Sequence, residues 1–572
     1  MSGSSEAGGL SGLNGANRLG TSNGTNGTDG VDRTPSTRVD VCVIGSGPAG
    51  ALVANELAGK GHDVVVLEAG PRFDFESRPE RMERAIRPTF SNDAVWEMGG
   101  ARDAFSSSGP RQYPLNAARA KGVGGSTLRW QGMVMRLHAA DFERRSREGV
   151  GADWPLSYDD LRPYYARAER ELGVAGAADN PFAPPRNEPF PLPAFPPSYS
   201  DSIFADACER LGVTTHSVPN ARNSEAHGGR SACVGYGTCQ PVCPSGAKYD
   251  ASTHAAAAER EGARVIDRAP VQRLATNSSG RRVTRATYAT PDGEHTQEAR
   301  QFVVACGGVE SPRLLLLSRS PQHPDGLANS SGVVGRYFME HLFAGVGGTL
   351  DRRTRQKHVG FMTSGTHQFY DDPGRETSGT EGMIPGKEGD FGPIKFEFLN
   401  YAGPSPVASA LEDGMWGNDL LESVKADYGT HIAIGGLVGQ LPRRENRIAL
   451  DPTTTDDHGN PVPDVQWSID SRTRRTLERA NEIQHAILEE LGADITWSVG
   501  PENTGPAYHH TGTTRMGTDP AESVVDARLR THDVSNLTIA SSSVFPTSGA
   551  MNPTLTIAAL ALKAARHLDR DL

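Results

Sequence analysis

The stretch that decides the fold begins with Arg38-Val39-Asp40-Val41-Cys42-Val43-Ile44 and runs into Gly45-Ser46-Gly47-Pro48-Ala49-Gly50. Its first segment is mostly apolar and β-branched, which predicts a buried strand that ends at the glycines. A helical pattern from Ala49 to Leu57 and a second strand from Asp63 to Glu68 follow. Strand, glycine turn, helix and strand together form a βαβ unit, which requires a parallel sheet with a right-handed crossover. The fold class predicted for this end of the chain is therefore α/β.

The spacing of Gly45, Gly47 and Gly50 is typical of a Rossmann-type turn that binds the pyrophosphate of a dinucleotide. The first glycine makes the turn, the second lets the backbone approach a phosphate, and the third permits close helix packing. The helix N-terminus favours the anionic phosphates, and Glu68 can accept a hydrogen bond from a ribose hydroxyl. A tight turn with only a structural role is the alternative. The predicted cofactor-binding residues are Gly45, Ser46, Gly47, Ala49, Gly50 and Glu68.

Length and composition limit the classes of protein that remain. With 572 residues, of which 36% are hydrophobic and 22% charged, the chain is long enough for two or more packed units. No apolar run is long enough for a membrane helix. A net charge of −11 argues against a nucleic-acid partner, because such partners are bound by clustered Lys and Arg. No secretion signal is recognisable, so the cytoplasm is the default location unless a partner carries an export signal.

The composition also changes along the chain. Residues 1–36 are rich in Gly, Ser, Asn and Thr, which predicts a disordered tail. Residues 37–340 are expected to form the dinucleotide-binding domain, with an insert or wrapping segment at about 141–230 that contains a proline-rich stretch at 180–199. Residues 341–500 contain strand-like segments and a helical pattern near 472–491, which predict a separate β-rich unit.

Further strands and glycines are expected around the dinucleotide site. Residues 281–290 and 295–305 alternate apolar with polar side chains like paired strands, and residues 303–308 run into a helical pattern at 311–317. The glycine-rich segment 122–127 could bring bare backbone close to an extended cofactor. A surface loop without a ligand is the equal alternative for that segment.

Two glycine-punctuated segments near the C-terminus carry the candidate catalytic groups. If the bound dinucleotide is a flavin that oxidises an alcohol, the reaction needs a base for the hydroxyl proton, and a neutral histidine suits that role. His509 and His510 are the candidates, with a structural role as the alternative for either. Asn552 precedes Pro553 and the helical run Thr554–Leu568, which predicts a helix with Asn552 as N-cap and proline at its first position. Asn552 could cap this helix or hold the substrate hydroxyl.

Taken together, these motifs resemble the glucose-methanol-choline (GMC) oxidoreductase family over nearly everything from Arg38 to Leu572. Besides the βαβ start and the two C-terminal motifs, the resemblance rests on Gly122–Trp130 and Gly307–Arg313. Asp153–Leu161 and Cys233–Lys248 are most similar to catalytic subunits of bacterial FAD-dependent sugar and sugar-acid dehydrogenases. Bacterial pyranose and glycoside oxidases of the same family are the second most similar group.

The resemblance implies FAD rather than NAD. It also implies an α+β molecule overall, with a Rossmann-type FAD-binding domain assembled from discontinuous segments that include 501–572 and with a sheet-based substrate-binding domain. His509 is the implied base, because the family's base lies three residues before the glycine of its His-x-x-Gly-Thr pattern. Asn552 is the implied second catalytic residue. Further cofactor contacts are implied at Gly125, Ser126, Val271, Asn552 and Pro553.

The implied reaction is hydride transfer from the carbinol carbon of a sugar or polyol to flavin N5. A quinone or cytochrome is the implied electron acceptor, and a small partner subunit is compatible with the resemblance. An oxidase that uses O₂ and a flavin-binding protein without turnover are the alternatives. Arg129 stands where fungal pyranose oxidases carry a flavin-linking histidine before Trp130. Because arginine cannot form that bond, non-covalent FAD is predicted.

Three of the six cysteines fall close together, at Cys233, Cys239 and Cys243, in a segment rich in glycine and proline. Thiolates brought together by such turns can bind an iron-sulfur cluster or zinc. The spacing is similar to that of dehydrogenases whose catalytic subunit carries a three-iron cluster. Buried structural thiols and another metal or redox role are the alternatives.

Overall fold

The computed structural model describes residues 38–73, 78–86, 95–355, 362–400, 410, 413–427 and 429–572. All of them belong to one unit of the chain, Pro35–Leu572. The tail predicted at residues 1–36 lies outside the described residues. Among the helices that are described, none is long and apolar enough to cross a membrane.

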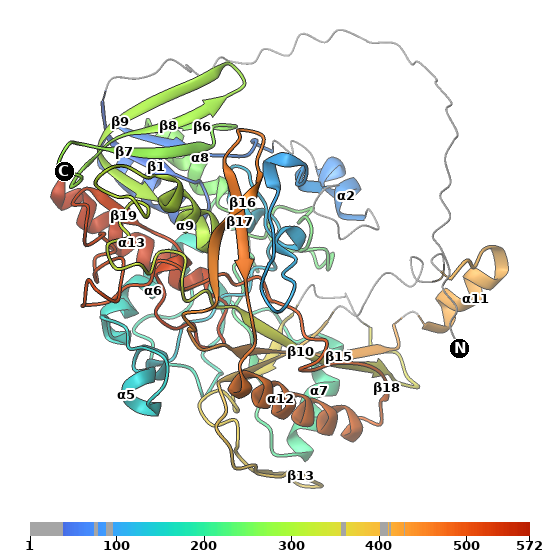
Figure 1. The fold of residues 1–572 in the computed structure, drawn as a ribbon. Coiled ribbons are helices and arrows are strands. Elements are labelled where there is room, and N and C mark those ends of the chain that lie inside the picture. The colour runs from blue at the N-terminus through green and yellow to red at the C-terminus, as the bar shows by residue number, and fades with distance from the viewer. Residues whose placement is uncertain are drawn as a thin grey trace, which may run out of the picture. The chain divides into compact units, whose positions relative to one another are not determined.

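The first of two large sheets is built on the predicted βαβ unit (Figure 1). Strand β1 (Val39–Ile44) pairs in parallel with β2 (Val64–Leu67), and helix α1 (Pro48–Ala58) connects them, as predicted. The strand order is β6-β2-β1-β9-β8-β7, with β19 beside β9. The other strands are β6 (Arg264–Ile266), β7 (Val271–Thr276), β8 (Val283–Thr290), β9 (Gly293–Val304) and β19 (Leu537–Ile539).

Helices from distant parts of the chain cover this sheet. Helix α1 packs against α8 (Ser252–Arg260) and α13 (Thr554–Asp571), and α13 packs in turn against α6 (Tyr158–Leu172). The side chains of β1 and β2 are almost all buried, because a mainly parallel sheet is covered on both faces. This explains the continuous apolar runs of these strands. The antiparallel pairing of β8 with β9 confirms the paired strands predicted at 281–290 and 295–305.

The second sheet has the order β18-β10-β15-β14-β11-β5, with antiparallel neighbours. Helix α12 (Ser471–Glu490) packs on β10 and β15, which agrees with the helical pattern predicted near 472–491. The edge strand β5 comes from the first half of the chain, whereas the other strands fall within 341–500. The strands are β5 (His216–Ser217), β10 (His341–Thr349), β11 (Ser364–Thr366), β14 (Ile394–Phe398), β15 (His431–Gly439) and β18 (Asp494–Val499).

One hairpin lies outside both large sheets and packs against a helix that follows the first sheet. Strands β16 (Arg447–Thr455) and β17 (Pro461–Gln466) pair with each other and lie along helix α9 (Gly307–Leu317), which follows β9 of the first sheet (Figure 1). The remaining elements are α2 (Arg78–Ile86), α4 (Ala139–Phe142), α5 (Arg144–Glu148), α7 (Tyr199–Arg210), α11 (Gly417–Asp427), β3 (Ala175–Gly176), β4 (Leu192–Pro193), β12 (Thr377–Ser378), β13 (Met383–Ile384) and the 3₁₀ helices η1 (Ala101–Asp103), η2 (Leu115–Ala117), η3 (Gly125–Leu128) and η4 (Ser542–Val544).

Candidate active site

A cavity of about 750 Å³ is lined by residues from both large sheets. The glycine turn after β1 contributes to one part of its wall. Phe343 and Leu437, on strands β10 and β15 of the second sheet, contribute to another part. The two C-terminal segments also reach it. The predicted site residues on this wall are Gly45, Gly47, Ala49, Glu68, Gly125, Ser126, Val271, His509, Asn552 and Pro553.

Two predicted cofactor-binding residues, Ser46 and Gly50, do not line the cavity but contact residues that do. The Ser46 hydroxyl donates to the Glu68 carboxylate at 2.7 Å, and the Ser46 backbone N–H donates to the same oxygen at 2.9 Å. A Cβ atom at Gly50 would lie 1.9 Å from the Gly45 carbonyl oxygen. Gly50 therefore permits the close approach of α1 to the turn.

The turn has the features that a bound pyrophosphate requires. Gly47 is the N-cap of α1 and gives it no side-chain hydrogen bond, so the first N–H groups of the helix are left for a ligand. A Cβ at Gly125 would lie 2.9 Å from Gly47 Cα, whereas a Cβ at Gly47 would meet no atom within 4 Å. Two stretches of bare backbone therefore meet at the cavity wall. This arrangement fits the diphosphate of FAD.

The Glu68 carboxyl group lies on the cavity wall and accepts three hydrogen bonds. One oxygen accepts both hydrogen bonds from Ser46, and the other accepts the Gly70 N–H at 3.0 Å. Burial raises the pKa of this carboxyl group above its ordinary value, against the effect of these hydrogen bonds. A carboxylate has about four lone-pair positions, so Glu68 can still accept a hydrogen bond from a ligand in the cavity.

The surroundings of His509 favour the neutral form of its ring. Its Nδ1 lies 2.9 Å from Nδ1 of His341, the first residue of β10. No residue in the described part of the chain forms a hydrogen bond with its Nε2. Burial, followed by the neighbouring His341 and Lys395, holds the pKa of His509 well below its ordinary value. The ring therefore stays unprotonated at neutral pH.

His510 lines the same cavity in different surroundings. Its ring packs on Tyr113 and Phe338, with ring centroids 5.7 Å and 5.9 Å away. Burial lowers its pKa to about 3, and Arg119 acts in the same direction. The structure thus places both predicted histidines at the cavity. Of the two, only His509 forms a hydrogen bond with a second imidazole, that of His341.

The buried carboxyl group of Glu340 connects the histidine segment to β10. One of its oxygens accepts the backbone N–H groups of His341 and His509, and the other accepts the Tyr113 hydroxyl. Burial raises the pKa of Glu340 to about 8. Bridges between Met339 and Thr511 and between Leu342 and Pro506 bring the two segments alongside each other. Sequence reasoning missed Glu340 and His341, because nothing local in the sequence indicates this pairing.

Asn552 is not the N-cap that the sequence predicted. Helix α13 starts at Thr554 with Pro553 as N-cap and without a side-chain capping bond. The physical reason is that the buried Lys395 ammonium group donates to the side-chain oxygen of Asn552 and also to Glu397. Lys395 and Glu397 were missed as well, although two charges at alternate positions of an apolar strand place them on one face.

The predicted metal site at the cysteines is not supported. Among the residues that the structure describes, no group of three or more His, Cys, Asp or Glu side chains could bind a metal ion. Cys233, Cys239 and Cys243 are free thiols. The Cys239 sulfur accepts a hydrogen bond from Arg222 at 3.8 Å, and the Cys243 sulfur lies 3.5 Å from the Ser245 hydroxyl. These thiols thus have separate protein partners.

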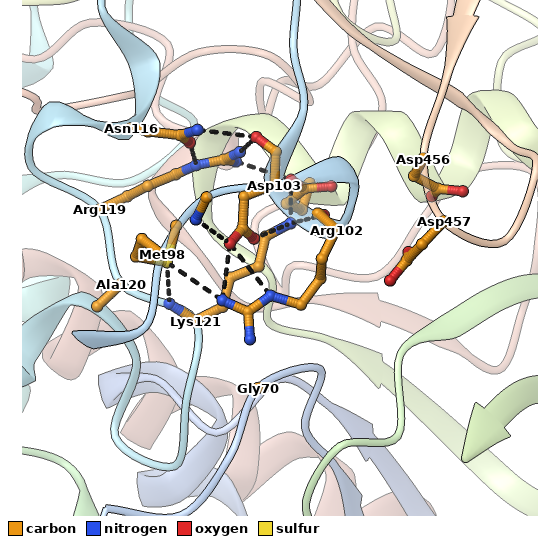
Figure 2. Close-up of polar contacts among 12 residues, drawn as sticks. Gly70, Met98, Arg102, Asp103, Asn116, Arg119, Ala120, Lys121, Asp456 and Asp457 are labelled. Atoms are coloured by element: carbon orange, nitrogen blue, oxygen red, sulfur yellow. Dashed lines mark hydrogen bonds and ion pairs between the residues drawn. The ribbon is translucent and has the colours of Figure 1, made fainter. Parts of the chain in front are cut away.

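Charged residues that sequence reasoning missed also line the cavity, among them Arg102, Lys121 and Asp456 (Figure 2). Buried Asp103 pairs with Arg102 at 2.7 Å and with Lys121 at 3.2 Å. Asp456, in the β16–β17 turn, pairs with Arg313 of α9 at 2.6 Å. No motif indicates the contact of Arg313 with Asp456, because it joins segments that are far apart in the sequence.

Comparison with known proteins agrees with this geometry. Two family models described as GMC oxidoreductase match residues 92–343 and 442–561, and an FAD binding domain model matches residues 38–84. The chain is similar in fold to pyridoxine 4-oxidase from Mesorbium loti, with a TM-score of 0.61, 17% identity and coverage of 93% of this chain and 99% of that chain.

Two curated relatives match the chain over almost their whole length. The fructose dehydrogenase large subunit of Gluconobacter japonicus is 33% identical over 93% of this chain and 98% of its own. The 6'''-hydroxyparomomycin C oxidase of Streptomyces lividus is 32% identical over 93% of this chain and 92% of its own. The predicted resemblance is confirmed: this chain belongs to the GMC oxidoreductase family and is an FAD-dependent oxidoreductase that acts on CH–OH groups.

Proposed function

We propose that this enzyme oxidises a sugar or polyol, with His509 as the base, and passes the electrons to an acceptor other than oxygen. FAD supplies the ring that accepts the hydride from the carbinol carbon. The observation that carries the proposal is the neutral, cavity-lining ring of His509, whose Nδ1 is engaged and whose pKa is held well below its ordinary value. Such a ring is ready to take the hydroxyl proton at neutral pH.

Asn552 is the proposed holder of the substrate oxygen. Because the Lys395 ammonium group can only donate, its bond to Asn552 occupies the amide oxygen. The amide NH₂ group of Asn552 forms no hydrogen bond with a described residue and remains a donor at the cavity. An NH₂ donor can bind the substrate hydroxyl and the negative charge that develops on its oxygen as the proton leaves.

Anaerobic bleaching of the flavin tests the proposal. Wild type and His509→Ala are mixed in a stopped-flow instrument with sugars, polyols, glycosides and simple alcohols. We expect His509→Ala to retain FAD and to reduce it at least ~100-fold more slowly, the loss that removal of a general base causes. Near-normal reduction by His509→Ala would exclude the histidine as base.

The electron acceptor is part of the proposal. The relative from Gluconobacter is named a dehydrogenase and the one from Streptomyces an oxidase, so O₂ is the second candidate acceptor. Because the first relative is named a large subunit, we include a small partner subunit, with a quinone or cytochrome receiving the electrons. Rapid reoxidation of the reduced enzyme in air would favour the oxidase, and slow reoxidation that a quinone accelerates would favour the dehydrogenase.

We further propose the domain division that the sequence indicates and non-covalent binding of FAD. Residues 37–340 and 501–572 would form the FAD-binding domain, which is supported by the pairing of β19 with β9 and the packing of α13 on α1. Residues 341–500 would form the substrate-binding domain. Arg129 lines the cavity next to Trp130 and offers no group for a flavin bond. Precipitation with acid should therefore release all the flavin into the supernatant.

A further inference from the structure

Two imidazole rings form a directed chain of hydrogen bonds behind the cavity. His341 Nε2 lies 3.2 Å from the Ser548 carbonyl oxygen, and His341 Nδ1 lies 2.9 Å from His509 Nδ1. The two rings are nearly perpendicular, at an interplanar angle of 83° and a centroid distance of 5.0 Å. The His341 ring is fully buried, whereas the His509 ring lines the cavity.

The direction of the chain follows from its fixed end. A carbonyl oxygen only accepts hydrogen bonds, so Nε2 of His341 carries the proton in its bond to Ser548. In a neutral imidazole the other nitrogen then has the lone pair. Nδ1 of His341 is therefore an acceptor as long as this ring stays neutral.

The surroundings keep His341 neutral. Burial lowers its pKa to about 3, and the nearby Lys395 ammonium group acts in the same direction. The Glu340 carboxyl group does not offset this lowering of the pKa by a hydrogen bond to the His341 ring, because it contacts the backbone N–H of His341, at 2.9 Å. His341 therefore accepts the proton of His509 Nδ1 in a hydrogen bond but does not take it.

The consequence for His509 is a single tautomer. With Nδ1 bearing the proton that is donated to His341, the lone pair of the neutral ring lies on Nε2. Nε2 is the nitrogen that no described residue engages. One carboxyl oxygen of Glu340 accepts the backbone N–H groups of both histidines, which holds the two backbone segments next to each other.

We propose that His341 is a positioning residue that keeps Nε2 of His509 unprotonated and available to the substrate. This inference rests on the proposed role of His509 as base. Without the acceptor at position 341, a neutral His509 can place its proton on either nitrogen and its ring can rotate. The tautomer that carries its proton on Nε2 cannot take a proton from the substrate hydroxyl.

A pair of variants of similar shape separates this role from packing. His341→Asn and His341→Leu both branch at Cγ, but only the asparagine oxygen can replace Nδ1 as an acceptor. We expect both variants to bind FAD. His341→Asn should reduce the flavin within about 10-fold of wild type, and His341→Leu at least ~10-fold more slowly than His341→Asn, as part of the contribution of a general base is lost.

The pH profile gives a second readout that packing alone would not change. Both variants lose the effect by which the His341 ring lowers the pKa of His509, so the informative comparison is between the two variants. An acceptor for Nδ1–H stabilises the protonated ring and raises its pKa, so the acid limb of the rate of flavin reduction should lie at lower pH in His341→Leu than in His341→Asn. The charged or titratable neighbours of His509 that could also move this limb, Lys395, His510 and Glu340, are unchanged in both variants.

The tautomer itself can be observed without turnover. In protein with ¹⁵N-labelled histidine, long-range proton–nitrogen correlations show which nitrogen of His509 carries the proton. We expect it on Nδ1 in wild type and in His341→Asn, with loss of this preference in His341→Leu. Equal rates in the two variants together with an Nε2 proton in wild type would overturn the role of His341. Normal flavin reduction by His509→Ala would instead overturn the base assignment, and the inference about His341 with it.

Discussion

The buried Lys395 ammonium group donates hydrogen bonds both to the side-chain oxygen of Asn552 and to the carboxylate of Glu397. Lys395 is fully buried, and burial lowers the pKa of its amine, whereas Glu397 raises it. The ion pair therefore keeps a charged lysine in a place where an isolated charge would be costly. It also joins strand β14 of the second sheet to the segment that leads into α13.

Removal of the lysine should reveal this cost. Lys395→Met leaves Glu397 as an unpaired buried charge, and the loss of one partner of a buried pair costs about 3–5 kcal/mol. We expect the thermal midpoint of the FAD-loaded enzyme, followed by circular dichroism, to fall clearly. The double variant Lys395→Met with Glu397→Gln removes both charges and should recover most of the loss. Equal midpoints for the single and double variants would show that the pair does not carry this coupling.

The pH dependence of flavin reduction should follow His509. Burial, then His341 and Lys395, hold the pKa of His509 well below the ordinary value of 6.5. A base works in its unprotonated form, so the rate should be flat above about pH 6.5 and decline only in more acidic solution. Anaerobic stopped-flow measurements from about pH 5 to about pH 9 check this. His510→Gln leaves the base in place but removes a neighbour that lowers its pKa, so its midpoint should lie at the same pH as in wild type or higher. A wild-type midpoint at or above pH 7 would contradict the assignment of the lowered pKa.

Sequence reasoning located the parts of the site that depend on local pattern. The turn at Gly45–Gly50 and the paired strands at 281–290 and 295–305 follow from spacing and alternation. His509 could be named only through the family resemblance. Lys395 and His341 could not be named at all, because their roles come from the pairing of segments more than a hundred residues apart.

The capping role of Asn552 shows how such distant contacts override local signals. Asn before Pro at the start of a helical run is a good N-cap signal in isolation. In the folded protein a lysine from another sheet occupies the asparagine oxygen, and the cap moves to Pro553. A local rule fails at this position because the side chain has a partner in the active site.

The close approach of Gly125 to Gly47 predicts a specific loss of FAD. In Gly125→Ala the new Cβ would lie 2.9 Å from Gly47 Cα and would displace two stretches of backbone that line the cavity, where the pyrophosphate of FAD is expected to bind. Overpacking of this kind costs about 1–3 kcal/mol, so FAD should bind about 5- to 150-fold more weakly. Titration of the apoprotein with FAD, followed by flavin fluorescence, measures the change.

Gly228→Ala is the matched control for this steric effect. Gly228 has the same φ of 56° as Gly125, but a Cβ there would meet no atom within 4 Å. Both substitutions therefore carry the same backbone strain, and only one crowds the turn. We expect FAD affinity close to wild type in Gly228→Ala. A similar loss of affinity in both variants would mean that strain, rather than contact with Gly47, is responsible.

The ion pair between Arg313 and Asp456 should slow the release of FAD. It ties the β16–β17 turn to α9 at 2.6 Å, and both side chains are about nine-tenths buried. The same turn donates from Asn460 to Gln272, which lines the cavity next to Val271. Because hydrogen bonds to charged groups contribute about 1.5–3 kcal/mol, loss of the pair should free the turn and accelerate release at least ~5-fold.

Asp456→Asn is the sharpest variant for this test. The amide keeps an oxygen for the N–H groups of His458 and Asn460, which Asp456 Oδ1 accepts at 2.9 Å, and so preserves the turn while removing the charge. Asp457→Asn is the control, because Asp457 lines the same cavity but forms no ion pair with an arginine in the described part of the chain. The measurement is the rate at which flavin fluorescence appears when the holoenzyme is diluted into buffer that contains excess ADP. The ADP competes with FAD for the emptied site and so prevents the flavin from binding again. Faster release in Asp456→Asn alone supports the role of the pair, and equal rates in both variants and wild type would show that the hairpin does not restrain the cofactor.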